Sequence, residues 1–165
     1  MGRRFVLSGE NLTLGTGNVL AALRPAAAGS AGSIIAIERV EISQNATATS
    51  AQLRVAIGQR DTGGTLTVTS ATPSPIVLGA PASGISGGTN PLTAATCGVN
   101  SSADSGGTYT NTYQINPNNQ GGFAWIAIPE HKIIVPPAAV FVVRFLATPT
   151  SSSGWTVSVW FDEIF

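Results

Sequence analysis

Charged side chains are scarce in this sequence. Asp, Glu, Lys and Arg make up 10% of its 165 residues, and the formal net charge is zero. A typical soluble domain carries about 25% charged residues. Nucleic-acid-binding proteins usually show a basic excess, because neutralising phosphates supplies much of their affinity. The sequence therefore predicts no nucleic-acid partner, and its weakly charged surface favours association with other proteins.

Cysteine and histidine each occur only once. A lone Cys97 cannot form an intrachain disulfide or a cysteine-based metal site. Its Thr, Ala and Gly neighbours offer no charge that would activate the thiol. One histidine without a local group of acids matches no ligand spacing typical of zinc or calcium sites. We expect no metal site and no cofactor.

No apolar run is long enough to span a bilayer. The best stretch, residues 138–147, is short and contains Arg144. The amino terminus has two arginines but only three apolar residues after them, which is not a signal peptide. No cluster of basic residues suggests a membrane surface. The sequence predicts no membrane partner.

Alternation of apolar and polar residues is the main pattern that is present, and it predicts β-strands. It is clear over residues 50–58 and 154–165. In residues 33–43 the apolar parity changes between Ile37 and Val40, so we expect a β-bulge near Glu38 and Arg39. Further strands are expected at residues 4–8, 18–24, 65–69, 75–79 and 108–116.

Turns rich in Gly, Pro, Ser and Asn separate these strands and predict a β-sandwich or barrel. Residues 80–107 contain few large apolar side chains and are expected to form a long surface loop, with at most one weak strand. Residues 121–129 and 138–147 are apolar on both faces, as in strands buried inside a sheet or under a partner subunit. We expect one all-β domain over residues 1–165, an antiparallel β-sandwich with long Gly/Ser/Thr-rich loops.

The single histidine lies in the sequence Glu130-His131-Lys132, between two apolar segments. Pro129 and Pro136 flank it, which is typical of a link that turns from one strand into the next. A catalytic triad would need a nucleophile and a third group oriented around this imidazole. No G-x-S-x-G elbow is present. We therefore expect a polar corner that faces water.

The acidic residues are few and scattered. Asp162 and Glu163 are adjacent, so a strand would point them to opposite faces. Glu38 and Glu41 flank the expected bulge and are interpreted as edge charges. A carboxylate hydrolase needs two acids facing each other across a cleft. The sequence predicts no enzyme and no small-molecule substrate, and a pair assembled only by folding stays an alternative.

Two tryptophans near the carboxyl end fall on opposite faces of one expected strand. Trp155 shares its parity with Val159 and is expected in the core. Trp160 shares its parity with Ser158 and is expected on the outside. Aromatic residues are enriched at protein interfaces. We favour an interface for Trp160 over plain packing or a bound ligand.

The order of these segments resembles the head decoration, or cement, proteins of tailed bacteriophages. The resemblance is carried by "RRFVLSGENLTL", "SIIAIERVEISQNATATSAQLRVAIGQR", "GGFAWIAIPEHKIIVPPAAVFVVRFLATP" and "WTVSVWFDEIF". It implies a jelly-roll fold and a homotrimer that sits on the outer capsid surface. Such a trimer would bridge major-capsid subunits and stabilise the shell. The protein would be made in the bacterial host cytoplasm and reside in the virion.

The resemblance also implies roles for particular residues. Residues 1–8 would form an amino-terminal arm that docks on the capsid, with Arg3 and Arg4 as donors and Phe5 as an apolar anchor. Trimer contacts would come from Phe141, Val143, Trp160 and Phe165.

Three other functions fit a β-sandwich of this kind. A phage tail, fibre or lectin-like module that binds a receptor or carbohydrate would expose Tyr109, Tyr113 or Trp160 in a groove. A jelly-roll hydrolase would bring Glu130 and His131, or two acids, into one pocket. A small coat protein would usually carry a basic arm for nucleic acid, and two arginines are few for that role.

Overall fold

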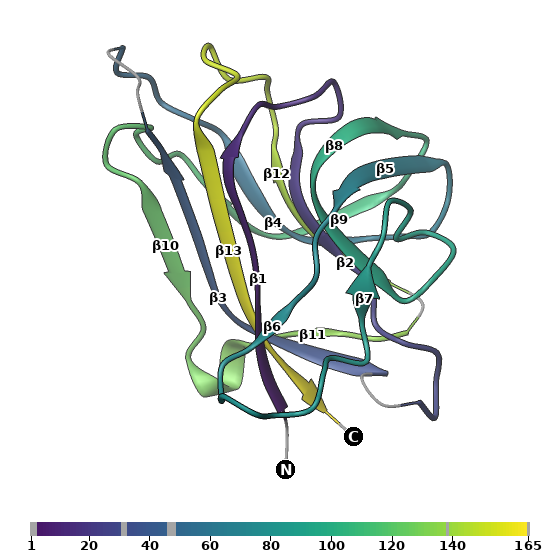
Figure 1. The fold of residues 1–165 in the computed structure, drawn as a ribbon. Coiled ribbons are helices and arrows are strands. Elements are labelled where there is room, and N and C mark those ends of the chain that lie inside the picture. Colours follow the sequence, from purple (N-terminus) through teal and green to yellow (C-terminus); the bar gives the residue numbers. More distant parts are fainter. Residues whose placement is uncertain (1–2, 31–32, 46–48, 138, 165) are drawn as a thin grey trace.

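The structure is a computed structural model, and it describes residues 3–30, 33–45, 49–137 and 139–164. Two β-sheets pack face to face, as Figure 1 shows, so the predicted all-β sandwich is confirmed. A short 3-10 turn, η1 (Pro129–His131), joins two of the strands. The described part of the chain holds no helix that could cross a membrane.

Sheet A has the strand order β10-β3-β13-β1-β6, and β11 also pairs with β3. Its strands are β1 (Arg3–Leu12), β3 (Ile34–Gln44), β6 (Ser74–Pro75), β10 (Phe123–Ile126), β11 (Ile133–Val135) and β13 (Trp155–Ile164). Sheet B has the order β5-β8-β2-β12-β4-β9, with β7 beside β8. Its strands are β2 (Val19–Leu23), β4 (Val55–Arg60), β5 (Thr65–Ser70), β7 (Ser86–Gly87), β8 (Thr96–Ser105), β9 (Tyr109–Ile115) and β12 (Val140–Phe145).

The strand order is that of a jelly roll. The eight main strands are, in chain order, β1, β2, β3, β4, β9, β10, β12 and β13. Sheet A joins the first, eighth, third and sixth of these, and sheet B joins the second, seventh, fourth and fifth. These pairs are all antiparallel, as in a double Greek-key sandwich. Strands β5 to β8 form an insertion between the fourth and fifth main strands.

The core between the sheets follows from the alternation in the sequence. Trp155 is 1% exposed, its indole N–H donates to the carbonyl of Ser151 at 3.1 Å, and its ring packs on Phe145 with centroids 4.8 Å apart. Fully burying an aliphatic or aromatic side chain of this size is worth about 1.5–3 kcal/mol. The placement of Trp155 in the core is confirmed.

The predicted β-bulge lies in β3. Ile37 pairs with Phe161 and Arg39 pairs with Trp160, so Glu38 has no partner on β13. This extra residue restores the inward parity, and the two apolar pairs on either side of it are all buried.

Strand β12 is buried on both faces within a single chain. Phe141 and Val143 face the core between the sheets and are 0% exposed. Val140 and Val142 face the other side of sheet B, where Leu66 of β5 and other apolar residues cover them. The expected trimer contact through Phe141 and Val143 is therefore wrong, because the curled β5–β8 insertion and the second sheet supply the cover that a partner subunit was expected to supply.

The stretch predicted as a long loop, residues 80–107, contains the ten-residue strand β8. Cys97 and Val99 on this strand are buried. At the next inward position the Ser101 hydroxyl accepts a hydrogen bond from the backbone N–H of Val19 at 2.9 Å. The sequence allowed one weak strand here rather than a ten-residue one, because small and polar residues occupy inward positions that usually hold large apolar ones.

The prediction of a strand over residues 75–79 is wrong except at Pro75, the last residue of β6. Strand β6 ends at Pro75, which has no N–H to donate to a ladder. Ile76 N–H still donates to the carbonyl of Arg4 at 3.1 Å, and the chain then turns, with Ala80 N–H donating to the carbonyl of Val77 at 3.1 Å and Gly79 at φ +81°.

The amino-terminal segment is part of sheet A. From Arg3 to Ser8 it pairs residue by residue with β13, while residues 1–2 lie outside the described part. Phe5 is 0% exposed and its ring lies 5.8 Å from that of Phe161. The expectation of a free arm over residues 3–8, with Phe5 as an apolar anchor, is therefore wrong.

Candidate interaction surface on the outer face of sheet A

The outer face of sheet A is the side turned away from sheet B. The exposed large hydrophobic residues of the described chain belong to β3, β10, β11 and β13 or to the segments that follow β6 and β10. Figure 1 shows the ends of these strands and these segments in its lower part. We call this set the apolar rim. It consists of Ile34, Ile76, Val77, Leu78, Ile126, Ile128, Ile134 and Ile164.

Strand register places half of the apolar rim on the sheet itself. Ile164 pairs with Ile34, and Asp162 of the same strand pairs with Ala36, which pairs in turn with Ile134. Nearer the middle of the sheet, Trp160 of β13 pairs with Arg39 of β3, which pairs in turn with Ile126 of β10.

The remaining rim residues come from the two edges of sheet A. Residues 76–78 follow β6 at one edge, and Ile128 follows β10 at the other. Leu78 is 101% exposed and Val77 is 66% exposed.

An ion-pair cluster lies in the middle of this half-face. Arg4 pairs with Glu38 at 2.9 Å and with Asp162 at 3.1 Å, and Lys132 pairs with the same two carboxylates. The hydrogen bond to Asp162 and its charge, with the charge of Glu38, raise the pKa of Arg4 above its ordinary value. Each such exposed pair contributes about 0–1 kcal/mol to stability, so the cluster mainly fixes where its charges lie.

Trp160 lies beside this cluster and is half-buried. The guanidinium of Arg39 sits 4.9 Å from the centre of its ring, as in a cation–π contact. Arg39 also pairs with Glu41. The outward orientation predicted for Trp160 is confirmed, while its role as an intersubunit contact stays a prediction.

Two adjoining hollows cross the half-face. Each has a volume of about 490 Å³, and they share Arg4 and Ile76 in their walls. The first extends to Trp160 and Ile126, and the second extends past Val77. Together they form a groove with a charged floor and apolar sides.

The other half of the outer face is polar. A hollow of about 330 Å³ there is lined by Glu41, Ser43, Thr156 and Ser158, with Phe123 at its side. Ser8 and Ser158 hydroxyls are 3.1 Å apart on neighbouring strands. The face therefore changes from hydroxyl-rich to apolar along the strands.

The Glu130-His131 segment forms the corner that the sequence predicts. It makes up the 3-10 turn η1, both side chains are exposed, and His131 N–H donates to the carbonyl of Ile128 at 2.9 Å. Among the described residues, no group of three His, Cys, Asp or Glu side chains is placed to hold a metal ion.

The adjacent acids Asp162 and Glu163 point to opposite faces, as predicted. Glu163 is 0% exposed and pairs with Arg3 at 3.0 Å. It also accepts hydrogen bonds from the Ser83 hydroxyl and from the backbone N–H of Gly84, the latter at 2.8 Å. Arg3 thus ties the two ends of the chain and the segment after β6 together, which is a structural role.

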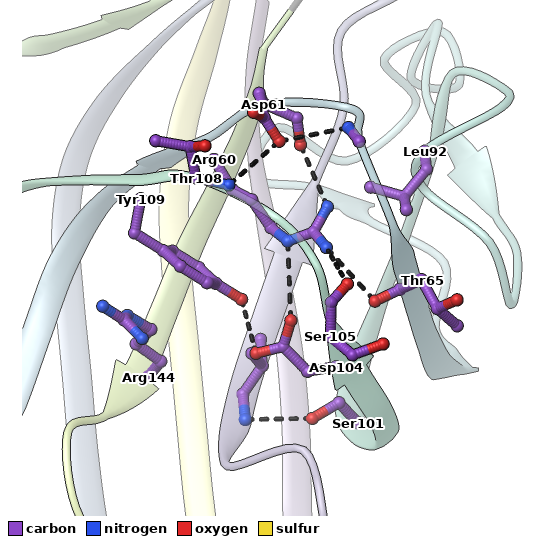
Figure 2. Close-up of polar contacts among 12 residues, drawn as sticks. Arg60, Asp61, Thr65, Leu92, Ser101, Asp104, Ser105, Thr108, Tyr109 and Arg144 are labelled. Carbon is purple, nitrogen blue, oxygen red and sulfur yellow. Dashed lines mark hydrogen bonds and ion pairs between the residues drawn. The ribbon is translucent and has the colours of Figure 1, made fainter.

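Figure 2 shows a buried charge that sequence reasoning missed. The side chain of Arg60 is fully buried, and it donates to the carbonyls of Asp61, Thr65 and Ser105 at 3.0–3.2 Å. Asp104 lies 3.5 Å from its Nε. Thr65, Asp104 and Ser105 belong to β5 and β8, so these contacts hold the insertion against the end of β4, and we infer that the cluster stabilises the fold.

Tyr109 belongs to the same buried cluster. Its hydroxyl donates to Asp104, and the Arg144 guanidinium lies 3.7 Å from the centre of its ring. Burial, followed by the hydrogen bond to Asp104, raises the pKa of Tyr109. Tyr113 packs on Trp125 against the core, with ring centroids 5.0 Å apart. Neither tyrosine joins Trp160 in a groove.

The predicted site residues are thus divided among different places. Arg4 and Trp160 share the outer face of sheet A, whereas Arg3 is part of the Glu163 tie. Phe165 lies outside the described residues. Comparison with known proteins gives no matching family model, no matching curated protein and no matching solved structure.

Proposed function

We propose that this protein is a structural component of a virus particle, a head decoration protein that binds the outer capsid surface as a homotrimer and bridges major-capsid subunits. The apolar rim is the observation that carries the proposal. It gathers eight exposed large hydrophobic side chains on one half of one face, and such concentrations of exposed apolar side chains usually mark interfaces with other macromolecules.

The low charge and the rigid sandwich support the same role. A structural protein needs many copies and a large contact area, and a threefold assembly multiplies each weak capsid contact through avidity. The two sheets and the buried Arg60 cluster provide a scaffold that needs no metal or disulfide at this chain length. Its task would be mechanical reinforcement rather than catalysis.

The test uses purified protein and heads of the encoding virus that lack it. Sedimentation should recover the protein with the heads at a fixed ratio to the major capsid protein, and decorated heads should withstand heating that ruptures bare ones. Protein that stays in the supernatant at all concentrations, with unchanged rupture of the heads, would exclude the proposal.

A second candidate is carbohydrate binding by a tail, fibre or lectin-like module. The hollow lined by Glu41, Thr156 and Ser158 favours it, because hydroxyls and a carboxylate beside the aromatic ring of Phe123 suit a sugar, and Trp160 lies two residues from Ser158 on the same face of β13. Binding to a glycan array that is lost in Trp160→Ala, without binding to heads, would favour this candidate.

A further inference from the structure

We infer that the hollow on the polar half of the outer face of sheet A binds a neutral sugar, with Glu41 and the neighbouring hydroxyls as hydrogen-bonding partners. We call it the polar hollow; it is the one lined by Glu41, Ser43, Thr156 and Ser158. The inference rests on the second candidate function, and it adds the position of the site and the charge of the sugar. It makes no use of the apolar rim.

Strand register builds the floor of the polar hollow. Glu41 of β3 pairs with Ser158 of β13. In the next outward row Ser43 pairs with Thr156, because side chains two residues apart on a strand point to the same face. Three hydroxyls and a carboxylate thus lie together on the outside of the sheet, and they supply both the donors and the acceptors that the hydroxyls of a sugar need.

An aromatic ring and a glycine turn form one side of the polar hollow. Phe123 of β10 is half-buried, packs against the core and lines the hollow beside Gly121 and Gly122. The two glycines add no side chain that would fill the space. The volume of about 330 Å³ lies within the range of small-molecule sites, about 300–1,000 Å³, which combine apolar or aromatic walls with a few polar groups.

A buried amide fixes the turn that carries this side of the hollow. Asn119 is 3% exposed, and its side-chain N–H groups donate to the side-chain oxygen of Gln44 and the backbone carbonyl of Thr49, both at 3.0 Å. Its side-chain oxygen accepts from the backbone N–H of Ala51 at 2.8 Å. The wall is therefore in place before a ligand arrives, and such preorganisation lowers the entropic cost of binding.

The charge of the lining selects among sugars. Of the described residues that line the polar hollow, Glu41 alone is charged. Arg39 engages its Oε1 and stacks on Trp160 outside the hollow, so Oε2 can accept hydrogen bonds from sugar hydroxyls. A sugar that carries a carboxylate would meet this like charge, which is costly at a binding site. Neutral sugars are therefore favoured over acidic ones.

Titrations followed by nuclear magnetic resonance test the inference, because they measure weak binding. The neutral probes are the methyl glycosides of glucose, galactose, mannose and N-acetylglucosamine, and the acidic probes are those of glucuronic acid and N-acetylneuraminic acid. We expect a neutral probe to bind wild-type protein more tightly than either acidic probe. Glu41→Gln should raise its dissociation constant at least about tenfold and Thr156→Val about fivefold, because each removes a hydrogen-bonding group.

Matched controls make the same chemical changes at exposed positions away from the hollow. They are Glu130→Gln in η1 and Thr112→Val in β9 of the other sheet, and both should bind the sugar as wild type does. Circular dichroism establishes that each variant is folded. Because Glu41→Gln and Thr156→Val alter different strands, either one that folds reports on the site.

Three outcomes would overturn the inference. Tighter binding of an acidic probe would do so, and so would binding that is lost in Trp160→Ala but unchanged in Glu41→Gln; both leave the carbohydrate candidate standing. Failure of every neutral probe to bind would also overturn it, and a glycan array without any binding would then exclude the carbohydrate candidate as well. Sedimentation with heads tests the capsid role separately, since none of these variants alters the apolar rim.

Discussion

At the scale of single residues, the molecule depends on polar groups that are fully enclosed. The Arg60 guanidinium is removed from water on folding. Three backbone carbonyls and the nearby Asp104 carboxylate take the place of the water molecules. Gly107 is required beside it, because a Cβ there would lie 2.3 Å from the guanidinium carbon. Buried charges of this kind are costly to leave without their partners.

Truncating Arg60 should therefore destabilise the fold severely. We expect Arg60→Ala to lower the free energy of unfolding by about 3–5 kcal/mol, because it leaves the Asp104 carboxylate buried and without its cation. Urea unfolding followed by fluorescence measures this. The control is Arg54→Ala at an exposed position, and equal losses in the two variants would contradict the prediction.

Alkaline pH should destabilise the fold through two side chains whose pKa is raised, the Cys97 thiol and the Tyr109 phenol. Burial raises the pKa of Cys97 from 9.0 to about 12, and burial with the Asp104 hydrogen bond raises that of Tyr109 from 10.0. The unfolded chain then releases protons that the native state retains, so stability falls as pH rises above about 9. Thermal unfolding from pH 7 to 11 should show a shallower decline in Cys97→Ala than in wild type. If the melting temperatures of the two proteins fall equally with rising pH, Cys97 does not contribute to the pH dependence of stability.

At the scale of elements, much of the fold could be predicted from the sequence. Alternation gave β1, β3, β4, β9 and β13, and the parity change in β3 located the bulge at Glu38. The length of strand β8 could not be predicted, because its inward positions include small residues such as Ser101, and only a weak strand was allowed there. The position of the candidate site was predictable only in part. Parity put Trp160 outside, but the neighbours Arg4 and Ile126 come from strands that only the sheet order brings together.

The close approach of β4 and β9 gives a prediction at this scale. A Cβ on Gly58 would lie 2.1 Å from the backbone oxygen of Thr110, and backbone cannot move aside as a side chain can. We expect Gly58→Ala to cost about 1–3 kcal/mol of stability, measured by urea unfolding. Gly121→Ala is the control, because its nearest atom is 3.9 Å away. If the two variants lose the same amount of unfolding free energy, β4 and β9 do not approach each other this closely at Gly58.

At the scale of the whole molecule, the two sheets meet solvent differently. Within sheet B, the β5–β8 insertion covers the outer side of β2 and β12, whereas sheet A presents an uncovered face with an apolar half. The chain has therefore already buried its most apolar strand, β12, within itself. What it leaves uncovered is the apolar rim, on which the proposed function depends.

Deleting residues 1–7 should unfold the protein rather than only release it from a partner. The deletion removes the part of β1 that pairs with β13 from Arg3 to Leu7, and it uncovers Phe161. Soluble yield and circular dichroism measure the loss. Deleting residues 1–2 alone leaves every described pairing in place and serves as the control. A truncated chain that keeps native stability would contradict the role of β1.

The direct pairing of Arg3 with Glu163 places the first and last strands side by side at their ends. A short flexible linker should be able to join the natural termini, and new ends could be opened between Gln120 and Gly121, which are both exposed. A circularly permuted chain of this kind would carry any fused cargo at the end of the sandwich opposite the apolar rim.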